Sequence, residues 1–145
     1  MNEWCRAGSA GPLDRRLRFD SAIAALNYAV TNVATARRII LSMPEAEERQ
    51  HHGHPDFRVN NKIFATLWPK ESRVVVKLSM ADQTVYLKSS PRTFSTNAWS
   101  GQGWTNVQLK YVSADRFREL VEDSWRDIAP KRLVAEHDAN RESNQ

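Results

Sequence analysis

The sequence has little cysteine and no long hydrophobic run. Its one cysteine, Cys5, excludes an intrachain disulfide and therefore the class of small secreted domains held together by disulfides. The nearest approach to a membrane span, residues 22–30, is interrupted by Asn27 and Tyr28 and falls far short of the ~20 apolar residues required. Acidic residues lie among the preceding arginines, and no small-residue cleavage site follows, so this stretch does not fit a signal peptide. We therefore expect a cytoplasmic protein that does not enter a membrane.

Motifs that carry catalysis are also missing. The chain contains no G-x-S-x-G nucleophile motif and no glycine-rich phosphate loop. Asp56 stands two residues after His54, and these side chains are the nearest approach to an acid–base pair. Polar neighbours before a strand are commonplace, however, and no nucleophile, base and orienting group form a recognisable set. The sequence predicts that the protein is not an enzyme and has no catalytic residue.

Three histidines, His51, His52 and His54, raise the question of a metal site, because imidazole is a common metal ligand. Neighbouring side chains of an extended chain point to opposite faces, so at most His52 and His54 can converge. No cysteine lies nearby, and the remaining histidine, His137, is close to the C-terminus. A turn whose imidazoles hydrogen-bond to backbone groups is the simpler interpretation. We predict no bound metal and no cofactor.

Charge is distributed unevenly along the chain. There are 21 Lys and Arg residues against 17 Asp and Glu, a formal net charge of +4. Residues 58–92 contain seven basic and two acidic residues, whereas residues 115–127 contain three basic and five acidic ones. Such asymmetry can orient a protein on a polyanion, although a solvated mixed surface gives the same counts.

The length fits one domain, and the apolar pattern places it at residues 31–134. Residues 1–30 are expected to be an N-terminal extension, poorly ordered or with a short helix over residues 21–30. Because the domain pattern starts directly after Val30, one hypothesis is that a misassigned start adds this extension, which mass spectrometry of the natural N-terminus would test. Residues 135–145 are expected to form a polar tail that is frayed from His137 onward.

Within the domain, helical spacing of apolar residues predicts a first helix from Asn32 that ends at Pro44. Residues 45–50 and the histidine segment are expected to connect it to the strands. Asn60-Asn61 suits a tight hairpin because asparagine tolerates positive φ. The period-2 pattern and turn residues predict the following further segments: strands at 56–59, 62–68, 73–78 and 104–112, a second hairpin connection at 69–72, a short helix at 79–88 capped by Ser79, and a loop at 93–103.

The last helix has the clearest pattern. Ser113 is expected to cap it, and Pro130 to end or kink it. Its apolar positions follow the i, i+3, i+4 rule and are Phe117, Leu120, Val121, Trp125 and Ile128. The order of elements predicts an α+β fold, with a mainly antiparallel sheet built from hairpins and with N- and C-terminal helices packed on one face.

The basic hairpins are the most informative feature for function. Regular pairing around the first turn sets Val59 opposite Lys62 and Arg58 opposite Ile63, so Arg58 and Lys62 are expected on opposite faces. Lys70, at a hairpin tip, can reach a phosphate. Such contacts would give affinity and salt dependence without sequence selection. The candidate DNA-binding residues are Arg58, Lys62, Lys70, Arg73 and Lys77.

Aromatic side chains can stack on bases, but most of those in the domain fit packing better. Trp125 lies in a helical apolar stripe and is expected in the core, and Trp68, at a strand end, is also expected to pack. Trp99, in the glycine-containing loop, is the best candidate for exposure.

An ordered set of short motifs resembles the MmcQ/YjbR-like family over residues 31–134. The set comprises the first helix, Ala36-Arg37-Arg38 through Leu41-x-Met43-Pro44-x-Ala46-Glu47-Glu48, followed by His52-Gly53-His54-Pro55, Phe57-Arg58-Val59, Lys62-Ile63-Phe64-Ala65, Gly103-Trp104 and Ser124-Trp125-x-x-Ile128-Ala129-Pro130. The resemblance implies a compact frataxin/CyaY-like fold, strand hairpins that form a double wing, and a DNA-binding role. It does not imply iron binding, because Arg37 and Arg38 stand where an acidic ridge would be needed.

Three functions remain, in the following order. The first is a DNA-binding protein with a transcriptional accessory role, monomeric by expectation, whose affinity falls steeply with salt. The second is a small-molecule or protein interaction module, with residues 53–55 and 99–104 lining a groove and binding that salt does not affect. The third is an enzyme or metal protein that uses His52 and His54, which elemental analysis would reveal.

Overall fold

The computed structural model describes residues 30–144, so Cys5 and all but the last residue of the predicted helix over residues 21–30 lie outside the described residues. The helices and strands, with short 3₁₀ turns between some of them, are α3 (Val33–Leu41), β1 (Glu47–His51), β2 (His54–Val59), β3 (Lys62–Trp68), η1 (Pro69–Glu71), β4 (Arg73–Lys77), α4 (Met80–Ser89), β5 (Phe94–Ser95), η2 (Ser100–Gln102), β6 (Trp104–Gln108), η3 (Leu109–Tyr111), α5 (Ala114–Ile128) and α6 (Lys131–Ser143).

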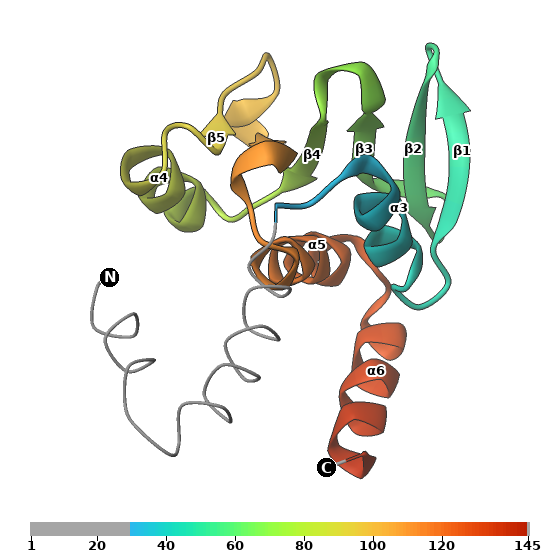
Figure 1. Ribbon diagram of the computed structural model, residues 1–145. Coiled ribbons are helices and arrows are strands. Elements are labelled where there is room, and N and C mark those ends of the chain that lie inside the picture. Colours follow the sequence, from blue (N-terminus) through green and yellow to red (C-terminus); the bar gives the residue numbers. More distant parts are fainter. Residues whose placement is uncertain (1–29, 145) are drawn as a thin grey trace, which may run out of the picture.

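The strands form one six-stranded sheet in the order β1-β2-β3-β4-β6-β5, and every neighbouring pair is antiparallel. Helices α3 and α5 pack together on one face of this sheet, α4 lies beside β5 at one end, and α6 projects away from the body (Figure 1). The α+β class and the antiparallel hairpin sheet predicted from the sequence are confirmed.

Turn chemistry explains the central hairpins. Asn60 and Asn61 both adopt left-handed backbone angles, with φ of 51° and 64°, as a two-residue hairpin turn requires. The turn fixes the predicted register, because Val59 pairs with Lys62 and Arg58 pairs with Ile63. The second connection closes through η1 and Ser72, whose φ of 50° is also left-handed.

Two segments predicted as connections contain strands. Residues 47–51 form the edge strand β1, although all five are polar or charged, because β2 supplies a full ladder of backbone partners. The predicted loop at 93–103 includes the two-residue strand β5. The predicted strand over 104–112 stops at Gln108, since Leu109 turns into η3 and donates its N–H to the Ser72 carbonyl at 2.8 Å.

The C-terminal segment also differs from the prediction of a frayed tail from His137. After Pro130 the chain forms α6, which extends to Ser143. Arg126 of α5 binds Asp138 of α6 with two hydrogen bonds, and Arg141 donates to Glu122 at 2.9 Å. The apolar residues of α6 that pack in or against the core, Leu133 and Val134, lie at its start, and the rest of the helix is held by these ion pairs. Hydrophobic spacing therefore did not reveal α6.

The core lies between the sheet and α5. On the covered face, Phe57, Leu67 and Val74 are fully buried, and Trp125 of α5 is fully buried against them in the same cluster. The predicted stripe of α5 is confirmed for Phe117, Leu120, Val121 and Trp125, all at most 1% exposed, while Ile128 is partly buried against the core.

Ser124 connects α5 to the two central strands. Phe57 pairs with Ala65 and Arg58 pairs with Ile63, so Phe64 lies between the paired residues as the extra residue of a β-bulge. Its carbonyl is not used in the β2–β3 pairing. The Ser124 hydroxyl donates to that carbonyl at 2.6 Å and accepts from the Lys77 N–H, at the end of β4, at 2.9 Å. One buried hydroxyl therefore satisfies two backbone groups.

Replacing Ser124 with alanine is expected to lower the free energy of unfolding by about 2 kcal/mol, because both backbone groups lose their partner. Urea denaturation followed by circular dichroism measures the change. Ser89→Ala is the matched control, since Ser89 is exposed on α4 and is expected to change stability by less than about 0.5 kcal/mol. Equal stability of the two variants would contradict this role for Ser124.

Candidate nucleic-acid interface

The structure divides the five predicted DNA-binding residues between the two ends of the central strands. Lys70 and Arg73 lie at the β3–β4 connection. Lys62 starts β3 and Lys77 ends β4, so both lie at the other end of the sheet, with Arg58 one residue from the β2–β3 turn. These residues therefore do not form one patch.

At the end of the sheet that holds Arg58, Lys62 and Lys77, carboxylates form ion pairs with two of these three cations. The Arg58 guanidinium binds the fully buried Asp56 through two hydrogen bonds of 3.0 and 3.1 Å. Hydrogen bonding to this carboxylate raises the pKa of Arg58. Lys77 lies 3.0 Å from Asp127 of the acidic helix α5. Lys62 is exposed on the opposite face from Arg58, as the register predicted.

Several contacts hold the Arg73 side chain in place at the β3–β4 connection. It donates to Glu71 at 2.6 Å and to Asn106 at 3.2 Å, and its guanidinium carbon lies 4.6 Å from the centre of the Trp68 ring. His54 stacks on Trp68 with ring centres 3.8 Å apart. Trp68 therefore packs between strand residues, which agrees with its predicted role in packing.

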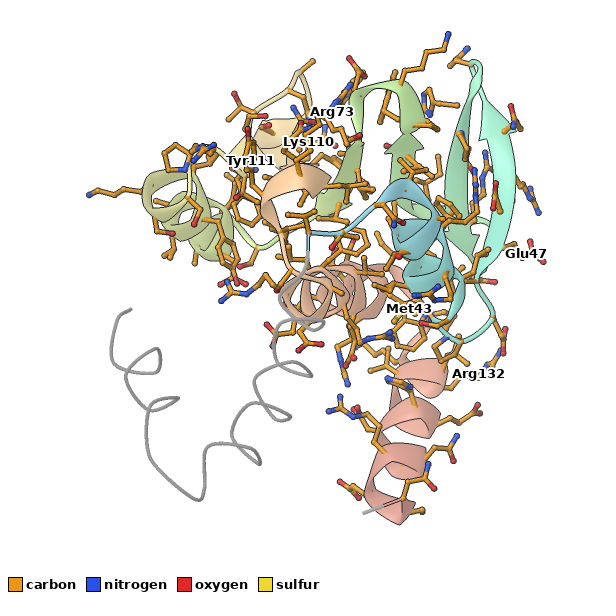
Figure 2. All side chains as sticks on the ribbon, viewed as in Figure 1. Met43, Glu47, Arg73, Lys110, Tyr111 and Arg132 are labelled. Carbon is orange, nitrogen blue, oxygen red and sulfur yellow. The ribbon has the colours of Figure 1, made fainter. Side chains whose placement is uncertain are left out.

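A second connection brings further positive charge to this end. The Leu109 N–H donates to Ser72 at 2.8 Å, and the Gln108 amide donates to the Glu71 carbonyl at 3.0 Å, so η3 lies against η1. Lys110 of η3 is exposed, and no carboxylate among residues 30–144 forms an ion pair with it or with Lys70. We call Lys70, Arg73 and Lys110 the basic end of the sheet; Figure 2 shows Arg73 and Lys110 on neighbouring parts of it.

Arg92 and Tyr111 lie next to the basic end. The Arg92 guanidinium carbon is 4.3 Å from the centre of the Tyr111 ring. Hydrogen bonding with Arg92 and the positive charge of its guanidinium lower the pKa of the Tyr111 phenol. Sequence reasoning counted Arg92 in the basic segment and placed Lys110 in a strand but gave neither a site, because only the order of strands in the sheet places these residues near the β3–β4 connection.

The groove proposed from residues 53–55 and 99–104 does not form between those segments. Residue 54 starts β2 at the end of the sheet near Arg73, whereas Trp104 pairs with Lys77 at the other end. Strands β3 and β4 also separate β2 from β6. Trp99 is 64% exposed, which confirms the prediction for this side chain.

Among the side chains that the structure describes, no three from His, Cys, Asp or Glu gather in a way that could hold a metal ion. In the same part of the chain, none of the helices has the length and apolar character needed to cross a bilayer.

Comparisons with known proteins agree with the motif resemblance. The model of the family described as YjbR matches residues 41–127. A solved structure, that of protein DR2400 from Deinococcus radiodurans with a DUF419 domain, superimposes with a TM-score of 0.63 at 17% sequence identity and covers 70% of this chain and 81% of its own. This likeness establishes the fold. No curated protein matches the chain.

Proposed function

This chain belongs to the YjbR family, and from that premise we propose that it is a non-catalytic, cytoplasmic DNA-binding protein that contacts phosphates mainly through the basic end of the sheet. One observation carries the proposal. Lys70, Arg73 and Lys110 come from two connections that hydrogen bonds hold together, and Glu71 is the one carboxylate paired there within the described residues.

The hairpins give this end a shape that suits a DNA groove. The β1–β2 turn and the β3–β4 connection lie at the same end of the sheet, because His54 starts β2 and Trp68 ends β3 there. A two-stranded ribbon fits the major groove of B-DNA. In the proposed arrangement the two hairpin ends are the two wings, and Lys70 and Lys110 reach the phosphates that flank the groove.

The remaining candidates have weaker roles in this proposal. Arg58 and Lys77 are bound to Asp56 and Asp127, so each would have to exchange a carboxylate for a phosphate. Lys62 is exposed but lies at the other end of β3. We expect these three residues to add to the long-range field rather than to contact DNA directly.

Fluorescence anisotropy with a labelled random duplex at two salt concentrations tests the proposal. We expect binding that weakens with salt, with a slope of log K against log salt of about −2 to −3 for two or three phosphate contacts. The variant Lys70→Glu/Arg73→Glu/Lys110→Glu is expected to bind at least about tenfold more weakly, because phosphate contacts provide most of non-specific affinity.

A charge-matched control separates the basic end from net charge. Arg38→Glu/Lys131→Glu/Arg132→Glu changes three exposed cations on α3 and α6 and is expected to retain most of the affinity. An equal loss in both variants would show that only net charge matters, and absence of binding at low salt would refute the DNA proposal for duplexes.

A further inference from the structure

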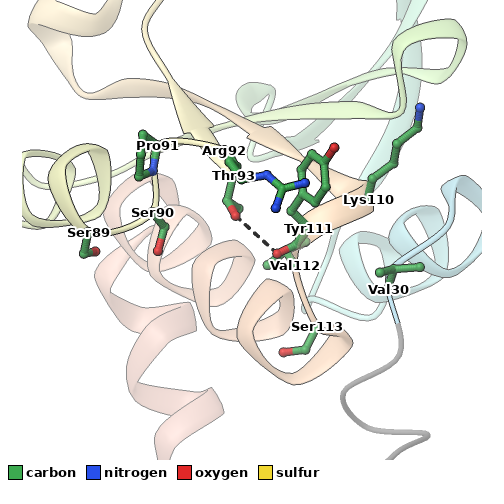
Figure 3. Close-up of a pocket in the computed structure, with 10 residues that line it drawn as sticks. All are labelled: Val30, Ser89, Ser90, Pro91, Arg92, Thr93, Lys110, Tyr111, Val112 and Ser113. Carbon is green, nitrogen blue, oxygen red and sulfur yellow. Dashed lines mark hydrogen bonds between the residues drawn. The ribbon is translucent and has the colours of Figure 1, made fainter. Parts of the chain in front are cut away.

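A cavity of about 520 Å³ opens beside Tyr111, between the connection that follows α4 and the segment that follows β6 (Figure 3). Its volume falls within the roughly 300–1,000 Å³ of small-molecule sites. The described residues that line it include two cations, Arg92 and Lys110, and no acidic side chain. A cavity with this lining favours an anion.

Arg92 is the group best placed to bind that anion. Its guanidinium stacks on Tyr111, and Figure 3 shows it beside the phenol ring. Stacking uses the flat face of a guanidinium, so the in-plane N–H groups that do not bond to the Tyr111 hydroxyl remain available, an arrangement that suits bidentate binding of phosphate. No carboxylate of residues 30–144 pairs with Arg92, whereas Arg58 and Arg73 both have such a partner.

Hydrogen bonds hold the cavity walls in place. The Thr93 hydroxyl donates to the Tyr111 carbonyl at 3.2 Å, and the Gln108 N–H donates to the Thr93 carbonyl at 2.7 Å. A site with walls that are already fixed loses little entropy on binding. Ser89 and Ser90 also line the cavity, where Figure 3 shows their hydroxyls directed away from the Arg92 guanidinium.

A second cavity of about 430 Å³ adjoins the first and shares Tyr111 with it. Its lining adds the carboxylates of Asp115 and Glu119, which can accept hydrogen bonds from hydroxyl groups, and the cation Arg116, which lies 3.6 Å from Glu119. The first cavity thus offers the cation Arg92 and the second offers carboxylate acceptors, and Tyr111 lines both.

We propose that the paired cavities bind a small phosphomonoester with a hydroxyl-rich body, such as a sugar phosphate. The phosphate binds Arg92, and the body lies against Tyr111 with its hydroxyls toward Asp115 and Glu119. This site shares Lys110 with the basic end of the sheet, but Lys70 and Arg73 line neither cavity. Arg92, which is not part of the basic end, therefore tests the site separately from the DNA-binding proposal.

Isothermal titration calorimetry of the full chain with ribose 5-phosphate, ribose and inorganic phosphate tests the site. Ribose 5-phosphate is expected to bind more tightly than inorganic phosphate, and ribose alone is expected not to bind. Arg92→Gln is expected to weaken ribose 5-phosphate binding at least about tenfold, since a charge-assisted bidentate contact is lost. Lys88→Gln is the control, because Lys88 is an exposed cation four residues away that does not line the cavity.

Three results would overturn the proposal: no binding of ribose 5-phosphate at millimolar concentration, equal binding by the Arg92→Gln variant, or equal affinity for inorganic phosphate. A competition experiment separates a free ligand from a nucleic-acid end of the same chemistry. If a 5′-phosphorylated oligonucleotide displaces ribose 5-phosphate and the same oligonucleotide without the phosphate does not, the site binds the phosphorylated ends of nucleic acids. The proposal of a small ligand then fails.

Discussion

Replacing Trp125 with alanine is expected to lower the free energy of unfolding by about 3–5 kcal/mol. Trp125 is among the largest fully buried side chains of the domain. Its indole N–H donates to the Pro44 carbonyl at 3.0 Å, and its ring meets His137 of α6 edge-on with ring centres 5.2 Å apart. The change would therefore open a cavity between α5, the segment after α3 and α6, and would also leave the partly buried Pro44 carbonyl without its donor.

Urea denaturation followed by circular dichroism measures this loss. Since small domains have a total stability of about 5–15 kcal/mol, the alanine variant can be partly unfolded without denaturant. Trp125→Phe keeps most of the volume but not the hydrogen bond and is expected to lose roughly 1–2 kcal/mol. Trp99→Ala is the control, because Trp99 is 64% exposed, and a loss as large as that of Trp125→Ala would contradict the assignment of Trp125 to the core.

Elements with local chemical signals could be predicted from the sequence. The stripe of α5 placed Trp125 in the core, and the pair Asn60-Asn61 fixed both the β2–β3 turn and its register. Ser79 and Ser113 accept the capping hydrogen bonds expected of them, from Asp82 and Arg116. Each of these signals comes from residues close together in the chain, so the amino-acid sequence alone reveals it.

Elements that depend on distant partners could not be predicted in this way. Strand β1 has no apolar alternation, and its pairing with β2 alone defines it. Helix α6 is held by ion pairs from Arg126 and Glu122 of α5, which no periodicity in α6 reveals. In both cases the stabilising contacts lie outside the segment itself.

The same distinction applies to the candidate site. Lys70 and Arg73 were found because they flank one connection, whereas Lys110 joins them only through the β4–β6 pairing. The pairing of Arg58 with Asp56, by contrast, could have been inferred, because residues i and i+2 of a strand share a face. That inference would have excluded Arg58 from the strongest candidates for phosphate contact before the structure was known.

Replacing Gly103 with alanine is expected to lower the free energy of unfolding by on the order of 3 kcal/mol. Gly103 has a φ of +100°, and an added Cβ would lie 2.3 Å from the Leu78 carbonyl oxygen. That oxygen is backbone and cannot rotate away. In addition, the Leu78 N–H donates to the Gly103 carbonyl at 2.9 Å, so relief of the clash would strain the contact that joins the end of β4 to the start of β6.

Gly101→Ala provides the matched comparison two residues away, because no atom lies within 4 Å of the Cβ that would be added there. We expect its unfolding midpoint to stay close to that of the natural chain, within about 0.5 kcal/mol, while that of Gly103→Ala falls. Because the β4–β6 pairing brings Lys110 to Lys70 and Arg73, loss of this junction should also weaken DNA binding at temperatures where the variant is still folded. A Gly103→Ala variant as stable as Gly101→Ala would show that the β4–β6 junction adjusts without cost, and the close approach at Leu78 would then have no structural role.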